Sequence, residues 1–341
     1  MPFSLAVPPG FSIETVSNRI RGARFLAVAP NGDVLVSEIQ AGQVVAVRPG
    51  SPVGAQPVVV AAGLQLPNGL AFRGNDLYIA TWSGIVIVRD YPRGTGSAAT
   101  LFSDMPRNGG HNARALALAA DGSIFISSGS DCNVCSETDS RLATILHYTP
   151  DGKQSVVYAK GLRNASGLAF DLQGRLWAVV NQRDNLAPSH TDLPPEELDL
   201  VRQGGDYGWP YCYPMGERRL PNPEFAQASC GAVLPTTMNM QAHSAPLQAV
   251  FYAASSFPAH YRGALFVAFH GSWNRQPPTG YKVVAIPFVD GKPTGVEDFV
   301  TGWLADTSRV LGRPVGVAIA ADGSLYISDD TGYLFHVSYR G

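Results

Sequence analysis

A repeated unit limits the possible folds of this chain more than any other feature of the sequence. Each copy is an apolar run, a turn that contains glycine, and a second apolar run, as in FLAVAPNGDVLVS at residues 25–37. Asn-Gly or Asp-Gly between apolar runs predicts a β-hairpin, because both central turn residues need positive φ. The copies span residues 25–37, 68–81, 113–129, 165–181, 249–271 and 314–330.

The spacing of these copies predicts an all-β fold, a six-bladed β-propeller with four-stranded blades. The turn glycines are Gly32, Gly74, Gly122, Gly174, Gly263 and Gly323. The first intervals match the ~40–50 residues of a propeller blade, and the two long ones predict insertions in blades four and five. Residues 11–17 precede the first copy, so we expect this N-terminal strand to complete the last blade and close the ring. We expect residues 1–341 to form a single domain.

The composition excludes several other classes of protein. The chain has 36 Gly and 26 Pro, and these helix breakers exclude a coiled coil or a helical bundle. Charged residues are only 15%, against roughly 25% in an average domain, and 45% are apolar, which excludes a disordered chain. The net charge of −2, with no block of like charge, gives no reason to expect nucleic acid as a partner. No apolar run approaches the ~20 residues of a membrane span.

The cysteines predict two disulfides. Cys132 and Cys135 form a C-x-x-C, and Cys212 and Cys230 lie 18 positions apart. Neither pair has further Cys or His at the spacing of a zinc site. A redox-active C-x-x-C is the alternative, although no thioredoxin-like βαβ context surrounds it. Disulfides indicate a periplasmic or secreted protein. The N-terminus lacks the pattern of a signal peptide, so we expect that segment to be absent from this chain.

Polar side chains stand directly before the inner strand of five repeats. In a propeller these positions converge on one face, around the entrance of the central channel. The residues at these positions are Arg24, Asn68, His111, Arg163, Asn164 and Arg313. Several cationic and amide groups at one channel entrance predict a pocket for an anionic, polar ligand.

Several segments carry a resemblance to a known family. They are HNARALALAADGSIFISSGSDCNVC (111–135), GLRNASGLAFDLQGRLW (161–177), QGGDYGWPYC (203–212), HSAPLQAVFY (243–252), YRGALFVAFHGSWNR (261–275) and GRPVGVAIAADGSLYISDD (312–330). From about residue 8 to 339 the chain resembles the glucose/sorbosone dehydrogenases. Members of that family are six-bladed propellers that oxidise sugars with pyrroloquinoline quinone (PQQ) and calcium. The C-x-x-C and GWPYC segments look nearest to the sorbosone-type bacterial branch.

The resemblance implies roles for the residues at the channel entrance. A sugar hydroxyl is a weak acid, so a base must take its proton as hydride leaves, and histidine suits this task. The resemblance gives this role to His111. The carboxylates of PQQ need cationic partners, and arginine pairs them bidentately. We expect Arg163 and Asn68 to bind the sugar, and Asn164, Arg275, Arg313, His270 and Arg114 to bind PQQ.

The resemblance also implies calcium. The ion beside PQQ would bind backbone carbonyls of Gln182 and Arg183, and a second, structural ion would bind Glu197 and the carbonyl of Tyr207. Carbonyl and carboxylate oxygens are suitable ligands for calcium, which would act on the quinone as a Lewis acid. The family has an acidic residue beside its catalytic histidine, but this chain has Gly110. No haem motif is present, so electrons would pass to an external acceptor.

Two other functions fit a propeller. One is a non-catalytic propeller that binds a glycan or another protein, since a fold does not fix a function. The other is a calcium-dependent hydrolase of the lactonase type, whose site needs side-chain carboxylates and Asn around the metal. The channel entrance here is richer in Arg, His and Asn than in acidic residues, which favours the dehydrogenase.

Overall fold

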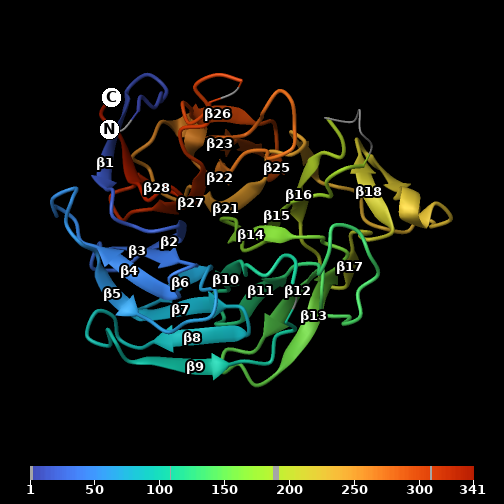
Figure 1. Ribbon diagram of the computed structural model, residues 1–341, viewed down its shortest axis with the longest axis horizontal. Coiled ribbons are helices and arrows are strands. Elements are labelled where there is room, and N and C mark those ends of the chain that lie inside the picture. The colour runs from blue at the N-terminus through green and yellow to red at the C-terminus, as the bar shows by residue number, and fades with distance from the viewer. Residues whose placement is uncertain (1–2, 108, 187–191, 308) are drawn as a thin grey trace.

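Six sheets stand around a central axis in the computed structural model (Figure 1). The structure describes residues 3–107, 109–186, 192–307 and 309–341. Each repeated unit forms the first two strands of one sheet, and two further strands complete it, so the predicted six-bladed propeller is confirmed. That residues 1–341 form one domain stays a prediction.

The blades follow the order of the chain. Blade 1 has β2 (Ala23–Val28), β3 (Val34–Glu38), β4 (Gln43–Val47) and β5 (Val58–Ala61). Blade 2 has β6 (Leu70–Arg73), β7 (Asp76–Thr81), β8 (Gly84–Val88) and β9 (Ala98–Phe102). Blade 3 has β10 (Leu116–Leu118), β11 (Ile124–Ser128), β12 (Thr144–Tyr148) and β13 (Ser155–Lys160).

The other three blades have the same strand order. Blade 4 has β14 (Ala165–Phe170), β15 (Leu176–Val180), β16 (Glu196–Leu200) and β20 (Met238–Met240). Blade 5 has β21 (Pro246–Phe251), β22 (Leu265–Phe269), β23 (Lys282–Ile286) and β26 (Glu297–Val300). Blade 6 has β27 (Pro314–Ile319), β28 (Leu325–Asp329), β29 (Leu334–Tyr339) and β1 (Phe11–Ser17).

The ring is closed by β1, as predicted. This N-terminal strand pairs antiparallel with β29, and Phe11 lies opposite Tyr339. The ring of Phe11 also makes edge contacts with Phe257 and Phe299, at centroid distances of 4.7 and 5.1 Å. Because aromatic pairs add about 0.5–1.5 kcal/mol beyond their buried area, these contacts anchor β1 against blade 5.

The two predicted insertions lie in blades 4 and 5. Between β16 and β20 the chain leaves the blade and forms the segment that protrudes at the right of Figure 1. This segment contains β18 (Cys212–Met215), β19 (Arg218–Pro221) and the 3-10 helix η1 (Pro223–Phe225). Earlier in the same connection, β17 (Gly205–Asp206) pairs parallel with β13 as a fifth strand of blade 3. Blade 5 contains the 3-10 helix η2 (Ala259–Tyr261) and the small hairpin of β24 (Phe288–Val289) and β25 (Lys292–Pro293).

The strand directions bring the candidate residues to one end of the channel. The first two strands of each blade are antiparallel, so the start of the first and the end of the second lie together. At the opposite end, the inner strands line an apolar cavity of about 360 Å³, with side chains such as Leu26, Leu116, Leu168 and Phe251. Among the described residues, no helix is long and apolar enough to cross a membrane.

Candidate functional site

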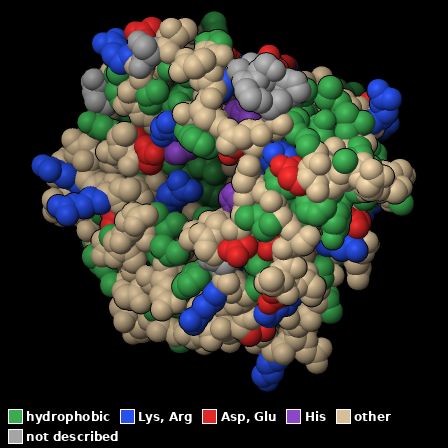
Figure 2. Space-filling model, turned by 45° about the vertical axis from the view of Figure 1, so that its right-hand side comes forward, with side chains coloured by type: hydrophobic (Ala, Val, Ile, Leu, Met, Phe, Trp, Pro, Cys, Tyr) green, Lys and Arg blue, Asp and Glu red, His purple; other side chains and the backbone are tan. Residues whose placement is uncertain are grey.

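The polar end of the channel is a hollow where basic side chains and histidines gather, with acidic groups at its rim (Figure 2). The loops that build it precede β10, β14 and β27 or follow β11, β15, β22 and β28. Carbonyl, guanidinium and imidazole groups from four blades therefore meet at one place.

His111 precedes β10 and rests on the loop that follows β11. Its Nδ1 lies 3.0 Å from the carbonyl oxygen and 2.8 Å from the hydroxyl oxygen of Ser130. Its backbone N–H donates to the same carbonyl at 2.9 Å. A carbonyl oxygen only accepts hydrogen bonds, so Nδ1 must carry a proton. In the neutral ring the lone pair therefore lies on Nε2.

The surroundings of His111 keep its imidazole neutral. Burial lowers the pKa of His111 to about 4, and the positive charge of Arg163 acts in the same direction. The hydrogen bond to Ser130 and the negative charge of Asp184 oppose this shift. At pH 7 the ring is therefore in the form that accepts a proton, as a general base requires.

Gly129 lets His111 approach Asn164. A Cβ atom at Gly129 would lie 2.6 Å from the Cβ of His111 and 3.1 Å from Oδ1 of Asn164. A larger residue would therefore push these two groups apart. The predicted base and the predicted quinone ligand are thus neighbours in the structure, although 53 positions separate them in the chain.

Arg163 is buried and tied to two loops. Its guanidinium donates to the carbonyl and side-chain oxygens of Asn133 at 3.0 Å each, and to the carbonyl of Gln182 at 2.8 Å. Burial lowers the pKa of Arg163 to about 10, against the opposing charges of Asp184 and Glu196, so the side chain stays cationic at neutral pH. Arg163 thus places a positive charge beside His111 and binds a carbonyl that was expected to bind calcium.

Behind Arg163 lies a group of titratable residues that the sequence did not single out. Nδ1 of His243 is 3.4 Å from a carboxylate oxygen of Asp184, and its Nε2 is 3.1 Å from the carbonyl oxygen of Leu193. Both neighbours are acceptors, and the bond to Asp184 raises the pKa of His243. Burial raises the pKa of Glu196 to about 7. No local motif marks this group, because its members come from separate loops.

A second cationic group lies where blades 1, 5 and 6 meet. His270 follows β22, and its Nε2 is 2.9 Å from a carboxylate oxygen of Asp330. Burial lowers the pKa of His270, and the charges of Arg24 and Arg313 contribute to the shift. The Nε of Arg24 is buried and has no hydrogen-bond partner within the described residues. A buried guanidinium nitrogen without a partner indicates space for an acceptor from a ligand.

Arg313 belongs to the same group. It donates to the carbonyl of Gly271 at 3.0 Å, and its guanidinium lies 4.9 Å from the ring centroid of Tyr281. Tyr281 is buried against the arginine. Arg24 and Arg313 both act electrostatically on His270, so three predicted channel residues lie together, with Asp330 beside them.

Two other predicted residues are buried in the contacts between blades. Arg114 is fully buried and donates to the carbonyls of Pro106 at 2.6 Å and Trp82 at 3.3 Å. Burial lowers the pKa of Arg114 to about 10. Asn68 is 1% exposed, and its amide donates to the carbonyl of Arg114 at 3.0 Å. A ligand in the channel would not reach either side chain without a rearrangement.

Arg275 and Arg183 also have protein partners. Arg275 donates to the carbonyl of Ala242 at 3.1 Å and pairs with the carboxylate of Asp192. Arg183 extends away from the channel and pairs with Glu224 in the protruding segment at 2.6 Å. Only the backbone carbonyl of Arg183, and not its side chain, could therefore contact a ligand at the channel.

Glu197, which was expected to bind the second calcium ion, forms an ion pair with an arginine instead. Glu197 and Arg219 form an ion pair at 2.6 Å, with both side chains 1% exposed. Gln182 and Thr236 also donate to the Glu197 carboxylate. With its oxygens engaged in this way, Glu197 does not fit a calcium ion. Burial and the charge of Glu197 raise the pKa of the neighbouring Asp199 well above its usual value.

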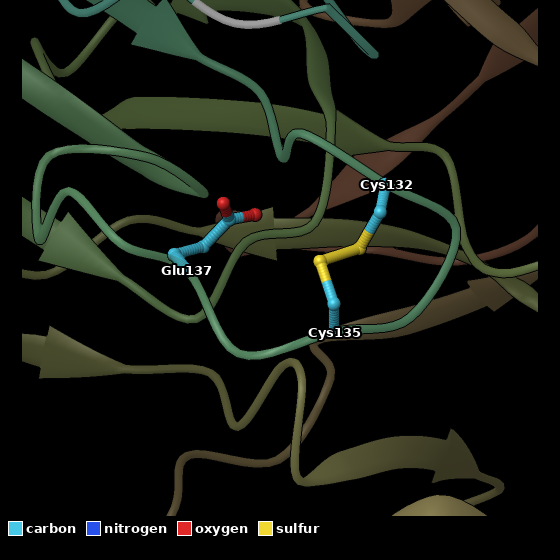
Figure 3. Close-up of side chains that lie close together, drawn as sticks. All are labelled: Cys132, Cys135 and Glu137. Carbon is cyan, nitrogen blue, oxygen red and sulfur yellow. A yellow bond between two sulfur atoms is a disulfide. The ribbon is translucent and has the colours of Figure 1, made fainter.

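Both predicted disulfides are formed, one by Cys132 and Cys135 and the other by Cys212 and Cys230. Figure 3 shows that Glu137 lies beside the first, with its carboxylate within 4.8 Å of the sulfur atoms. Cysteine binds metals as a thiolate, which a disulfide lacks, so these three residues are not a metal site in this form. The closed loop instead carries Asn133, which holds Arg163.

Comparison with known proteins extends over the whole chain. The family model described as TrAA12-like matches residues 5–340. A protein of Borreliella burgdorferi described as uncharacterized is 26% identical over 99% of this chain and 91% of its own length. The pyrroloquinoline quinone-dependent pyranose dehydrogenase of Coprinopsis cinerea is 30% identical, over 51% of this chain and 30% of the relative.

Solved structures share the fold. The holo form of the pyranose dehydrogenase PQQ domain from Coprinopsis cinerea superposes with a TM-score of 0.84 at 23% identity, covering 98% of this chain and 97% of that domain. The soluble aldose sugar dehydrogenase from Escherichia coli, in its apo form, superposes with a TM-score of 0.71 at 18% identity, covering 97% and 99%. The six-bladed architecture is therefore common to this chain and to PQQ-dependent sugar dehydrogenases.

Proposed function

The chain belongs to the TrAA12-like family, and on this basis we propose that it is a PQQ- and calcium-dependent dehydrogenase that oxidises a sugar of the aldose or sorbosone type. The observation that carries the proposal is a neutral, oriented imidazole at the same end of the channel as the buried Nε of Arg24, which has no hydrogen-bond partner among the residues that the structure describes. The first suits proton abstraction, and the second suits an anionic cofactor.

The residues present fit PQQ. Arg24 and Arg313 offer donors to carboxylates, His270 lies beside them with its Nε2 bonded to Asp330, and the absence of a side chain at Gly129 leaves His111 and Asn164 close together. When bound, PQQ supplies the acceptor that takes a hydride from the sugar carbon. Nε2 of His111 would take the proton of the sugar hydroxyl, and Asn164 would hold the cofactor against it. Arg163 would place its positive charge beside the oxygen that loses the proton.

Calcium would bind the backbone carbonyls of Gln182 and Arg183. A carbonyl oxygen has two lone pairs, so the hydrogen bond from Arg163 to Gln182 leaves one for a metal. The second site at Glu197 and Tyr207 is not part of this proposal, because the Glu197 carboxylate is already paired with the Arg219 guanidinium. The oxygen atoms that are available as calcium ligands therefore support one calcium site rather than two.

The remaining parts of the proposal concern the surroundings of the enzyme. Two disulfides favour a periplasmic or secreted location. The electrons would leave to an external acceptor, since the sequence contains no haem motif. The GWPYC segment supports the sorbosone-type branch within the wider group of sugar dehydrogenases.

Reconstitution tests the proposal. Purified protein should melt at a higher temperature with PQQ and calcium than with calcium alone, because a ligand of the native state stabilises it by mass action. The same sample should reduce an artificial dye when given aldoses or sorbosone. No thermal shift with PQQ and no dye reduction over a broad sugar panel would exclude this function. Tight glycan binding without PQQ would select the binding protein, and calcium-dependent lactone hydrolysis without quinone would select the hydrolase.

The variant His111→Ala separates binding from catalysis. It should still show the thermal shift with PQQ, because His111 does not contribute charge to the cofactor site. Its turnover should fall by about 10²–10⁴-fold, the usual contribution of a general base. Full activity of this variant would remove His111 from the mechanism.

A further inference from the structure

The orienting group of His111 is a serine in this protein. The hydroxyl and carbonyl oxygens of Ser130 are the two acceptors at Nδ1, at 2.8 and 3.0 Å. The residue directly before the histidine is Gly110, which offers no side chain. A general base usually needs a third group to hold its ring and its tautomer, and often this is a carboxylate. Here, neutral oxygens take that place.

Ser130 is itself held rigidly. It is completely buried, and its backbone N–H donates to the carbonyl of Arg163 at 2.8 Å. Its hydroxyl donates to the carbonyl of Cys132 at 2.9 Å. Because the hydroxyl proton is used in this bond, the oxygen presents a lone pair to His111. The disulfide-closed loop of Cys132 and Cys135, seen in Figure 3, therefore orients the serine.

We propose that Ser130 is a positioning residue that holds His111 in the tautomer with its lone pair on Nε2, and that the Cys132–Cys135 loop sets the direction of the serine hydroxyl. This inference rests on the proposed role of His111 as the base. The two acceptors at Nδ1 decide which ring nitrogen is available for the substrate, and they do so without adding a negative charge to the site.

The contact of Nδ1 with two neutral oxygens has a chemical consequence. The charged groups that face His111 are Arg163, which disfavours the imidazolium, and Asp184, which favours it. A carboxylate at Nδ1 would favour the imidazolium strongly, whereas a hydroxyl and a carbonyl favour it weakly. The serine thus leaves a weaker base that stays unprotonated in acidic solution.

The tautomer is measured directly by nitrogen NMR of the cofactor-free protein labelled with ¹⁵N-histidine. In the wild type, the proton of the neutral His111 ring should reside on Nδ1. In Ser130→Ala, which keeps the carbonyl but removes the hydroxyl, a second population with the proton on Nε2 should appear. The matched control is Ser127→Ala, another buried serine of blade 3, whose hydroxyl accepts the N–H of Ala115. This control should keep the wild-type tautomer.

Kinetics of the reconstituted enzyme give the second measurement. Ser130→Ala should lower kcat for the sugar by about 10-fold or more, with KM unchanged, because a misplaced base affects the chemical step. Ser130→Asp should move the acid limb of kcat/KM upward by about 1–2 pH units, since an adjacent carboxylate raises the pKa of histidine.

The outcomes separate this inference from the proposed function. A wild-type ring protonated on Nε2, or a tautomer in Ser130→Ala identical to that of the wild type, overturns the positioning role whatever the activity is. If the wild type shows no sugar oxidation, the proposed function fails, and the NMR measurement still decides the role of Ser130. If Ser130→Asp does not fold, the alanine variant and its control decide alone.

Discussion

Arg219→Met is the substitution with the largest expected effect on stability. The side chains of Arg219 and Glu197 are both 1% exposed and 2.6 Å apart, so the substitution would leave a carboxylate buried without its cationic partner. Removal of one partner from a buried ion pair costs about 3–5 kcal/mol. In a protein of this size, about 1 kcal/mol corresponds to ~2 °C in Tm, so we expect a decrease of about 6–10 °C.

Thermal unfolding followed by circular dichroism, with and without a calcium chelator, measures this effect. The control is Arg218→Met, which changes the neighbouring, exposed arginine in the same strand and should leave Tm within about 1 °C of the wild type. The double variant Arg219→Met with Glu197→Gln should recover part of the loss, because the unpaired charge is gone.

Two results would refute this reasoning. A Tm of Arg219→Met equal to that of the wild type would mean that the pair contributes nothing. A wild-type Tm that the chelator lowers by as much as the substitution does would mean that calcium, and not Arg219, neutralises Glu197.

Three further predictions concern the channel end. Because burial lowers the pKa of His111 to about 4 and the base acts unprotonated, kcat/KM for the sugar should stay level as pH falls to about 5; a decline centred near 6.5 would contradict this. Arg24→Gln should weaken PQQ binding in a titration by about 10–100-fold, since a charge-assisted hydrogen bond contributes about 1.5–3 kcal/mol, whereas the exposed Arg21→Gln should have no effect. Serine at both Cys132 and Cys135 should lower kcat, because the loop that holds Arg163 loses its cross-link; wild-type kcat would argue that the loop is rigid without it.

The blade architecture was predictable because its signal is local. Alternating turns and apolar runs recur along the chain, and each hairpin forms between residues that are close in sequence. The closing strand at residues 11–17 follows from counting, since a ring of complete blades needs one strand more than the last repeat provides. The same argument located the insertions of blades 4 and 5, whose intervals exceed a blade length.

The partners of the charged residues were not predictable, because they come from different blades. In the sequence, Arg24, Arg114, Arg275 and Arg313 look alike, as polar residues next to a repeat. In the structure, Arg114 donates to carbonyls and Arg275 to a carbonyl and a carboxylate, whereas the buried Nε atoms of Arg24 and Arg275 have no hydrogen-bond partner within the described residues. A guanidinium needs several acceptors within about 3 Å, and the order of residues in the chain does not reveal which acceptors those are.

The sequence alone therefore determined the propeller, its closure and the end of the channel where polar groups gather. Tertiary structure alone decided which of those groups bond to other parts of the protein. Ser130 at Nδ1 of His111 and Arg219 on Glu197 illustrate the difference, since each contact joins segments about 20 residues apart or more. The apolar pattern of a strand can be recognised from that strand's own sequence. The hydrogen bonds of a buried charge form only when blades and loops pack together.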